Sequence, residues 1–172
     1  AMTSSGKYML AETCCYFHYV KTCEEIVKSG RLGTVFHAEA EYVHEIQGLV
    51  VNPDTGETLW RVGRPPLHYC SHSLGPLLMF LDDWVVKATG SGARHDVLED
   101  WGPGTISMQT GLFETKKGVT IKLLRSSLAP GPYHLFYNVY GSKGFLETDR
   151  HSTRGKGMVF VEGGEREDFE LH

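Results

Sequence analysis

Two histidines, His68 and His72, stand four residues apart in an apolar stretch that runs from residue 67 to residue 81. An imidazole exchanges a proton near neutral pH, so a histidine beside a substrate serves as a general acid or base. If the stretch is helical, a spacing of four places both rings on one face. We predict His72 as the catalytic acid/base and His68 as a ligand for substrate hydroxyls. The competing interpretation of each is a structural histidine.

Three further side chains are of types that bind sugars. Tyr16 stands at the start of a predicted helix, and His44 lies near the end of a predicted strand. Arg61 follows Trp60 in an irregular stretch, and an arginine beside an aromatic ring suits a sugar or a carboxylate. We predict all three as substrate-binding residues. Each also has a structural interpretation: a core aromatic for Tyr16, strand packing for His44 and a surface ion pair for Arg61.

The cysteines and histidines do not follow a metal-binding pattern. The sequence has four cysteines (Cys14, Cys15, Cys23 and Cys70) but no C-x-x-C and none of the short, repeated spacings of zinc sites. The pair His68 and His72 would need further ligands to hold a metal ion. We therefore expect no metal, and free, buried thiols in a reducing, cytoplasmic compartment.

The sequence also lacks the motifs of a self-sufficient enzyme. It contains no P-loop, no G-x-S-x-G and no H-E-x-x-H. The nearest approaches to a dinucleotide-binding G-x-G-x-x-G are residues 90–92 and 102–104, and neither lies between a predicted strand and a predicted helix. With a formal net charge of -4 and no block of Lys and Arg, we expect no nucleic-acid partner. No apolar run approaches the roughly 20 residues that cross a bilayer, so we expect no membrane partner.

Hydrophobic periodicity predicts the elements that must position these side chains. Helical spacing over residues 16–29 predicts an amphipathic helix, and alternation over residues 34–45 predicts a long, half-buried strand. A short strand is expected at residues 8–11 and a short apolar helix within residues 67–81. Turn residues 52–56 suggest the tip of a small hairpin. Later strands are predicted at 84–90, 105–114, 119–128, 135–140, 145–148 and 158–161, and a solvated tail hairpin at 162–168.

Helices early in the chain and hairpin-connected strands late in the chain indicate the fold class. We predict a single α+β domain over residues 1–172, with a largely antiparallel open-faced β-sheet and helices packed on one face. Both faces of the late strands carry large apolar side chains, and the helices cover only one of them. The uncovered face predicts a homo-oligomer, with Arg125 beside the two-fold axis.

Four segments resemble a known family in their order and spacing. Residues 9–16 are similar to a strand with a V-x-E-N-x-x-Y pattern, and residues 29–39 to a helix end x-x-G-x-L-G followed by a long strand. Residues 67–76 resemble a D-x-x-x-H helix, and residues 140–147 a Y-G-T-K-G-x-L-E hairpin. Together they resemble the C-terminal, substrate-binding domain of the glucose–fructose oxidoreductase / inositol dehydrogenase / MocA family. Thr13 in place of the usual Asn and His68 in place of the usual Asp depart from that pattern.

This resemblance implies a partner domain and a chemistry. Family members carry an N-terminal Rossmann domain, with the glycine-rich loop and a catalytic lysine in an E-K-P motif, and neither is in this sequence. The implied reaction is hydride transfer between NAD or NADP, bound mainly by that Rossmann domain, and a carbon of a sugar or cyclitol. The resemblance places His72 at the family's cleft. We expect the domain alone to be inactive.

Two alternatives to the oxidoreductase stay open. NAD-dependent glycoside hydrolases of the same superfamily carry segments like E-N-C-C-Y, Y-x-H-D and Y-x-T-H-x-L-G-P, which residues 12–16, 42–45 and 69–76 resemble. A non-catalytic binding or oligomerisation module is the other alternative, and it would be favoured if the gene carries no Rossmann half.

Overall fold

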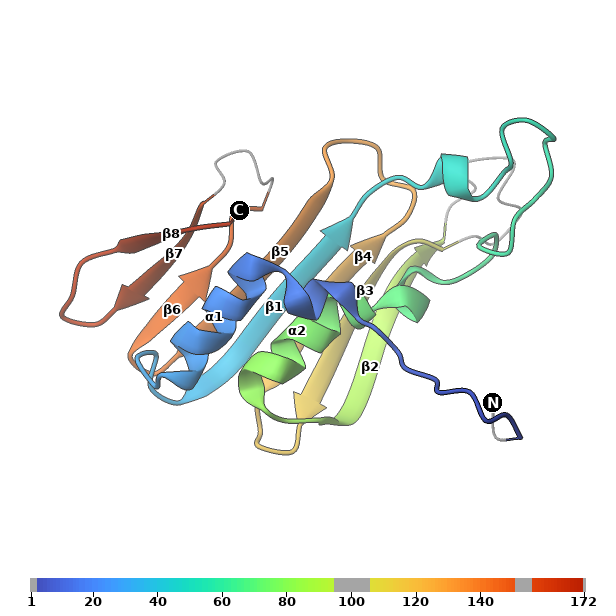
Figure 1. Cartoon of the computed structure of the whole chain (residues 1–172). Coiled ribbons are helices and arrows are strands. Elements are labelled where there is room, and N and C mark those ends of the chain that lie inside the picture. Colours follow the sequence, from blue (N-terminus) through green and yellow to red (C-terminus); the bar gives the residue numbers. More distant parts are fainter. Residues whose placement is uncertain (1–2, 95–105, 151–155, 172) are drawn as a thin grey trace.

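The computed structural model describes residues 3–94, 106–150 and 156–171, and within them one eight-stranded sheet carries two α-helices (Figure 1). The strand order is β2-β3-β4-β1-β5-β6-β7-β8. Neighbouring strands pair antiparallel except β1 and β4, which run parallel. The predicted α+β class with a largely antiparallel, open sheet is therefore confirmed. The elements are η1 (Thr13–Tyr16), α1 (His18–Lys28), β1 (Val35–Val43), η2 (Gln47–Leu49), η3 (Pro66–Tyr69), α2 (Ser71–Leu81), β2 (Val85–Arg94), β3 (Ile106–Thr115), β4 (Thr120–Ser126), β5 (His134–Gly141), β6 (Gly144–Glu147), β7 (Lys156–Val161) and β8 (Glu167–Glu170).

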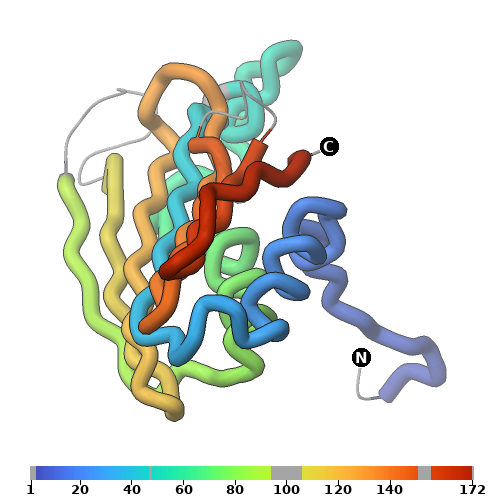
Figure 2. The backbone as a smooth tube through the Cα atoms, turned by 90° about the vertical axis from the view of Figure 1, so that its left-hand side faces the viewer, coloured from blue at the N-terminus to red at the C-terminus, as the bar shows by residue number. Residues whose placement is uncertain are grey.

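Both α-helices lie on the same face of the sheet, which Figure 2 views nearly edge-on. Side chains alternate along β1, so Ala38 and Ala40 face the helices and are fully buried. Their register partners on β4, Ile121 and Leu123, share that face and are fully buried too. Phe80 of α2 packs into the same core cluster. The apolar core thus lies between the helices and the centre of the sheet.

The first helix forms as predicted but begins later. Residues Val20, Cys23 and Val27 lie on its buried face, in agreement with the helical periodicity. Phe17 has an extended backbone (φ -63, ψ 140), which separates α1 from the 3-10 helix η1 before it. The strand predicted at residues 8–11 is wrong: this segment is irregular and pairs with no described strand. The segment has a strand-like composition, but no neighbouring strand is present to accept and donate its backbone hydrogen bonds.

The short apolar helix predicted within residues 67–81 is confirmed as α2, and the separate 3-10 helix η3 precedes it. The 3-10 helix η3 ends at Tyr69, and α2 starts at Ser71. Pro76 lies inside α2, and it has no N–H to give to the carbonyl of His72 four residues earlier. The hydroxyl of the buried Tyr137 donates to that carbonyl oxygen instead, at 2.5 Å. A sheet side chain thereby replaces a helix hydrogen bond at the residue predicted to be catalytic.

The sheet face away from the helices carries charged side chains as well as exposed apolar ones such as Leu112 and Phe160. Its centre carries Glu39, whose carboxylate pairs with Lys122 on the neighbouring strand and with His37. Arg125 shares a face with Ile121 and Leu123, as alternation predicts, but this is the helix face, where Arg125 is 3% exposed, so its predicted place beside a two-fold axis is wrong. Alternation along β4 excludes it from the open face and from an axis there.

The remaining predictions for the chain ends and turns have mixed outcomes. The hairpin near residues 52–56 is confirmed by the bridge between Val51 and Thr58. The tail hairpin is confirmed, and β8 pairs with β7 after it. The glycine pair at 102–104 lies outside the described residues. No helix in the described ranges is both long and apolar enough to cross a membrane.

Candidate functional site

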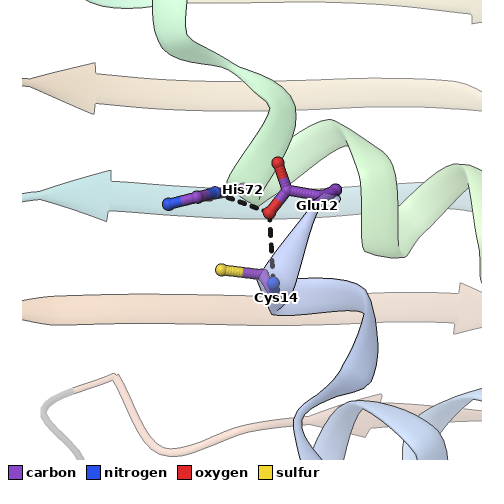
Figure 3. A group of neighbouring side chains, drawn as sticks. All are labelled: Glu12, Cys14 and His72. Atoms are coloured by element: carbon purple, nitrogen blue, oxygen red, sulfur yellow. Dashed lines mark hydrogen bonds and ion pairs between the residues drawn. The ribbon is translucent and has the colours of Figure 1, made fainter. Parts of the chain in front are cut away.

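A hydrogen-bonded chain of three side chains joins the N-terminal segment to the start of α2, and Figure 3 shows two of them, Glu12 and His72. The Glu12 carboxylate lies 2.6 Å from His72 Nδ1, and the Tyr69 hydroxyl lies 2.8 Å from His72 Nε2. Glu12 and His72 are mostly shielded, with side chains 16% and 17% exposed. Tyr69 is the outermost member and is 47% exposed. The chain therefore leads from solvent at the phenol to a shielded carboxylate.

The state of Glu12 assigns the protons along this chain. Burial alone would raise the pKa of Glu12, but hydrogen bonds from Ser71 and from the Cys14 N–H, together with His72, lower it below its ordinary value. An ionised carboxylate only accepts, so His72 Nδ1 donates to Glu12, and in the neutral form of the imidazole Nε2 is then the acceptor. The Tyr69 hydroxyl then donates to Nε2. Burial and nearby Glu12 raise the pKa of Tyr69, so the phenol keeps its proton at neutral pH.

The short helix η1 holds Glu12 at this place. The Glu12 carboxylate caps η1 by accepting from the Cys14 N–H at 3.1 Å, which satisfies a free backbone donor. Gly75 of α2 permits the close approach, because a Cβ there would lie 3.3 Å from both Cys15 Sγ and Glu12 Cγ. The contact between Glu12 and His72 thus depends on how η1 packs against α2.

A pocket of about 170 Å³ opens beside the hydrogen-bonded series of Tyr69, His72 and Glu12. Of the residues predicted from sequence, His44, Arg61 and His68 line it. His72 is not in the lining but lies directly behind it, since Tyr69 and Tyr42 line the pocket and their rings lie 4.6 and 5.4 Å from the His72 ring.

Two residues predicted to bind substrate lie differently from the arrangement that the sequence suggested, and both roles stay predictions. Tyr16 is 73% exposed and lies outside the pocket lining, with Lys21 Nζ 5.5 Å from its ring. His68 and His72 do not form a shared helical face, because η3 and α2 are separate helices and only His68 lines the pocket.

Aromatic rings and Arg125 form the inner wall of the pocket. The His44 ring lies 4.7 Å from the Tyr42 ring and 5.5 Å from that of Tyr133. Burial lowers the pKa of His44, and the neighbouring Arg125 lowers it further, so the ring is neutral at neutral pH. The Arg125 guanidinium lies 4.2 Å from the centre of the Tyr42 ring. A flat, aromatic and cationic wall of this kind suits a polar, ring-shaped ligand.

Two residues of the site, Glu12 and Tyr69, were not singled out from sequence and appeared only as letters within longer motifs. Arg125 was singled out, but for a place beside a two-fold axis and not for this site. Tyr69 carried a detectable signal, because it precedes His72 by three residues and contains a titratable hydroxyl. Glu12 carried none, since 60 residues separate it from His72.

One group of side chains has metal-ligand chemistry. The ligand atoms of Glu12, Cys14 and His72 all lie within 4.8 Å of one another. Burial, with Glu12 adding to it, raises the pKa of the Cys14 thiol to about 12. A metal ion is bound by the thiolate, so this environment opposes metal binding at neutral pH.

The described residues do not make a dinucleotide site by themselves. Pyrophosphate binding needs a glycine-rich turn between a strand and the N-terminus of a helix. Gly90 and Gly92 instead lie inside β2, paired with Gly111 and Gln109 of β3. Gly90 and Gly92 therefore do not form a pyrophosphate-binding turn.

Comparison with known proteins identifies the family. The family model for the GFO/IDH/MocA C-terminal domain matches residues 20–147. The chain therefore belongs to this family, as the four sequence segments predicted.

Two curated relatives match most of this chain. A glycosyl hydrolase family 109 protein from Stenotrophomonas maltophilia is 25% identical over 91% of this chain and 43% of that protein. An alpha-N-acetylgalactosaminidase from Bacteroides fragilis is 23% identical over 81% of this chain and 39% of that protein. The chain thus spans about two-fifths of these curated relatives.

Among solved structures, an inositol dehydrogenase homolog from Azotobacter vinelandii, complexed with NADH and myo-inositol, has a TM-score of 0.70 at 18% identity. The match covers 91% of this chain and 40% of the chain of the inositol dehydrogenase homolog. A levoglucosan dehydrogenase, complexed with NADH and levoglucosan, has a TM-score of 0.75 at 12% identity, over 95% of this chain and 46% of that chain. These likenesses establish the shared fold.

Proposed function

We propose that this chain is the substrate-binding half of an NAD(P)-dependent oxidoreductase that acts on a hydroxyl of a sugar or cyclitol. The observation that carries the proposal is the proton chain from Tyr69 through His72 to Glu12, at the edge of a pocket lined with aromatic rings. Solved structures of the same fold, complexed with NADH and myo-inositol or with NADH and levoglucosan, support the reaction class. The cofactor, NAD or NADP, is then held mainly by a Rossmann domain outside this chain.

The side chains of this half would manage the proton of the reaction. A nicotinamide, when bound, would supply the hydride acceptor, and the proton of the substrate hydroxyl would pass to the oxygen of Tyr69. Tyr69 in turn gives its own proton to His72 Nε2, and the new imidazolium is stabilised by the ionised Glu12 at Nδ1. Glu12 thus orients the ring and offsets its charge, the usual role of a carboxylate behind a catalytic histidine.

The test is a substitution of His72 in the full-length protein that carries this chain. We expect His72→Ala to lower turnover by about 10²-fold or more, the usual scale for loss of a general acid or base, and to leave NAD(P) affinity nearly unchanged. His18→Ala is the matched control, because His18 is exposed at the start of α1 and outside the pocket lining. Near-normal turnover of the His72 variant would make that histidine structural.

A second candidate function is glycoside hydrolysis with transiently used NAD. The curated relatives named above are a glycosyl hydrolase family 109 protein and an alpha-N-acetylgalactosaminidase, which favours it. Incubation of the full-length protein with NAD and aryl glycosides separates the two. Release of the aglycone without net NADH indicates the hydrolase, whereas NADH accumulation on a free sugar indicates the dehydrogenase.

A further inference from the structure

The pocket beside His72 collects positive charge in a chain that is acidic as a whole. Three arginines line it, Arg61, Arg64 and Arg125, and no aspartate or glutamate does. Among the described residues, no carboxylate forms an ion pair with any of the three arginines. The formal net charge of the chain is -4, so this concentration of unpaired cations is local to the pocket.

Arg125 is the least solvated of these cations. It is 3% exposed, and its guanidinium lies 4.2 Å from the Tyr42 ring centre and 5.9 Å from that of Tyr69. Its Nη1 donates to the carbonyl oxygens of Tyr42, at 3.2 Å, and Ser126. Its Nε is buried without any hydrogen-bond partner. A guanidinium carries five N–H donors, so these two carbonyls satisfy only part of its capacity.

A purely structural role for Arg125 accounts for this arrangement poorly. Burial of a charged group away from water costs on the order of several kcal/mol, unless a counter-charge and further hydrogen bonds compensate. Burial indeed lowers the pKa of Arg125, although the nearby tyrosines act in the opposite direction. An apolar residue would fill this position between Leu123 and the end of β4 with no such cost. A buried donor left unpaired at the wall of a pocket is instead suited to a ligand that accepts.

Arg61 adds a second positive charge to the lining of the pocket. It is half-buried, and its guanidinium is held 4.4 Å from the centre of the Trp60 ring. Both guanidinium groups therefore lie against aromatic rings. This reduces the conformational entropy that each side chain loses when its N–H groups bind a planar or tetrahedral anion. Tyr69 lies between this charge and His72, because it contacts Arg125 with its ring and His72 with its hydroxyl.

We propose that this pocket binds a negatively charged substituent, a carboxylate or a phosphate, on the sugar whose hydroxyl reaches Tyr69. The substrate class would then be acidic sugars such as hexuronates or sugar phosphates, not neutral hexoses. This inference rests on the proposed function for the sugar itself, but the charge of the ligand follows from Arg125 and Arg61 alone.

The test compares charged sugars with neutral counterparts by calorimetric titration of the full-length protein. The pairs are D-glucuronate with D-glucuronamide, D-galacturonate with D-galacturonamide, and glucose 6-phosphate with glucose. We expect at least one acid to bind about tenfold or more tightly than its neutral counterpart, the scale of a charge-assisted hydrogen bond. The uronate pairs and the phosphate pair distinguish a carboxylate from a phosphate site.

Three variants assign the preference to the pocket. Arg125→Met removes the buried charge with a side chain of similar length, and a buried ion replaced by an apolar group is usually tolerated. Arg61→Gln changes a loop residue and keeps the test valid should the first variant fail to fold. Both are expected to lower the preference for the acid at least about fivefold, within the range for one lost charged contact. Arg31→Gln is the control, since Arg31 pairs with Glu167 outside the pocket and should leave the preference unchanged.

The outcomes separate this inference from the proposed function. Equal affinity for acid and neutral members of every pair, or a preference that survives Arg61→Gln and Arg125→Met, overturns the anion site. Acid preference without any NAD(P)-dependent turnover overturns the proposed function and leaves the anion site standing. Turnover of neutral sugars without acid preference overturns the anion site and leaves the proposed function standing.

Discussion

Tyr137→Phe tests how the sheet positions the candidate catalytic histidine. The Tyr137 hydroxyl donates to the carbonyl of His72 at 2.5 Å, and Pro76 cannot supply the N–H that this carbonyl would otherwise accept in a helix. Phenylalanine keeps the ring, which packs against Phe80 and Tyr19 in the core. The substitution therefore removes one donor and leaves the packing nearly unchanged.

The expected cost follows from the unsatisfied carbonyl. Loss of the partner of a buried polar group costs about 1–3 kcal/mol. The hydrogen bond between Tyr137 and His72 is only partly buried, and water can compensate in part, so we expect the lower half of that range. At ~2–4 °C per kcal/mol for a protein of this size, Tm should fall by ~2–8 °C.

A double-mutant cycle with Pro76→Ala makes the test specific. Alanine at residue 76 introduces an N–H that can donate to the His72 carbonyl through the normal helical hydrogen bond. Tyr137→Phe should therefore cost about 1 kcal/mol less in the Pro76→Ala background than in the natural chain. The assay is chemical denaturation of all four proteins, followed by circular dichroism.

The result that would refute this reasoning is an equal cost of Tyr137→Phe in both backgrounds. The Tyr137 hydroxyl would then stabilise the fold through a contact other than its hydrogen bond to the His72 carbonyl, which Pro76 leaves without a helical N–H donor. In the full-length enzyme, turnover of the Tyr137→Phe variant should fall while cofactor affinity stays unchanged, because the helix turn that carries His72 loses its anchor.

Three further predictions concern pH, thiol reactivity and assembly. The folded state lowers the pKa of His44, so the unfolded chain takes up the proton first, and stability should decline as the pH falls below about 6.5; denaturation curves at several pH values should show a smaller decline for His44→Gln. Alkylation followed by mass spectrometry should label the partly exposed thiols before the buried ones, whose pKa is raised to about 12 by burial: Cys15 and Cys70 before Cys14 and Cys23. Preferred native-state labelling of Cys14 would contradict that order. Self-association through the open sheet face stays a prediction, and a monomer of 19.2 kDa in light scattering of this chain would contradict it.

The periodicity of the sequence was sufficient to predict most of the elements. Alternation along residues 34–45 placed Ala38, Ala40 and Tyr42 on one face, and all three are buried on the helix side of β1. Helical spacing located the buried face of α1 in the same way. Both patterns reflect contacts with a single apolar core, which requires only that one face of an element be buried. The same local rule failed at residues 8–11, where no neighbouring strand is present.

The identity of His72 as a candidate was available from its residue type, but its environment was not. Glu12 lies 60 residues away in sequence and Tyr137 lies 65 away, and both bond to His72. Which side of the sheet Arg125 faces followed from alternation, yet its place in the pocket depended on its pairing with Tyr42 in the parallel register of β1 and β4. The sequence alone therefore determined which residues have the chemistry and which faces are apolar. Only the tertiary structure decided which of them meet, because strand register and the packing of η1 on α2 arise from contacts between segments far apart in the chain.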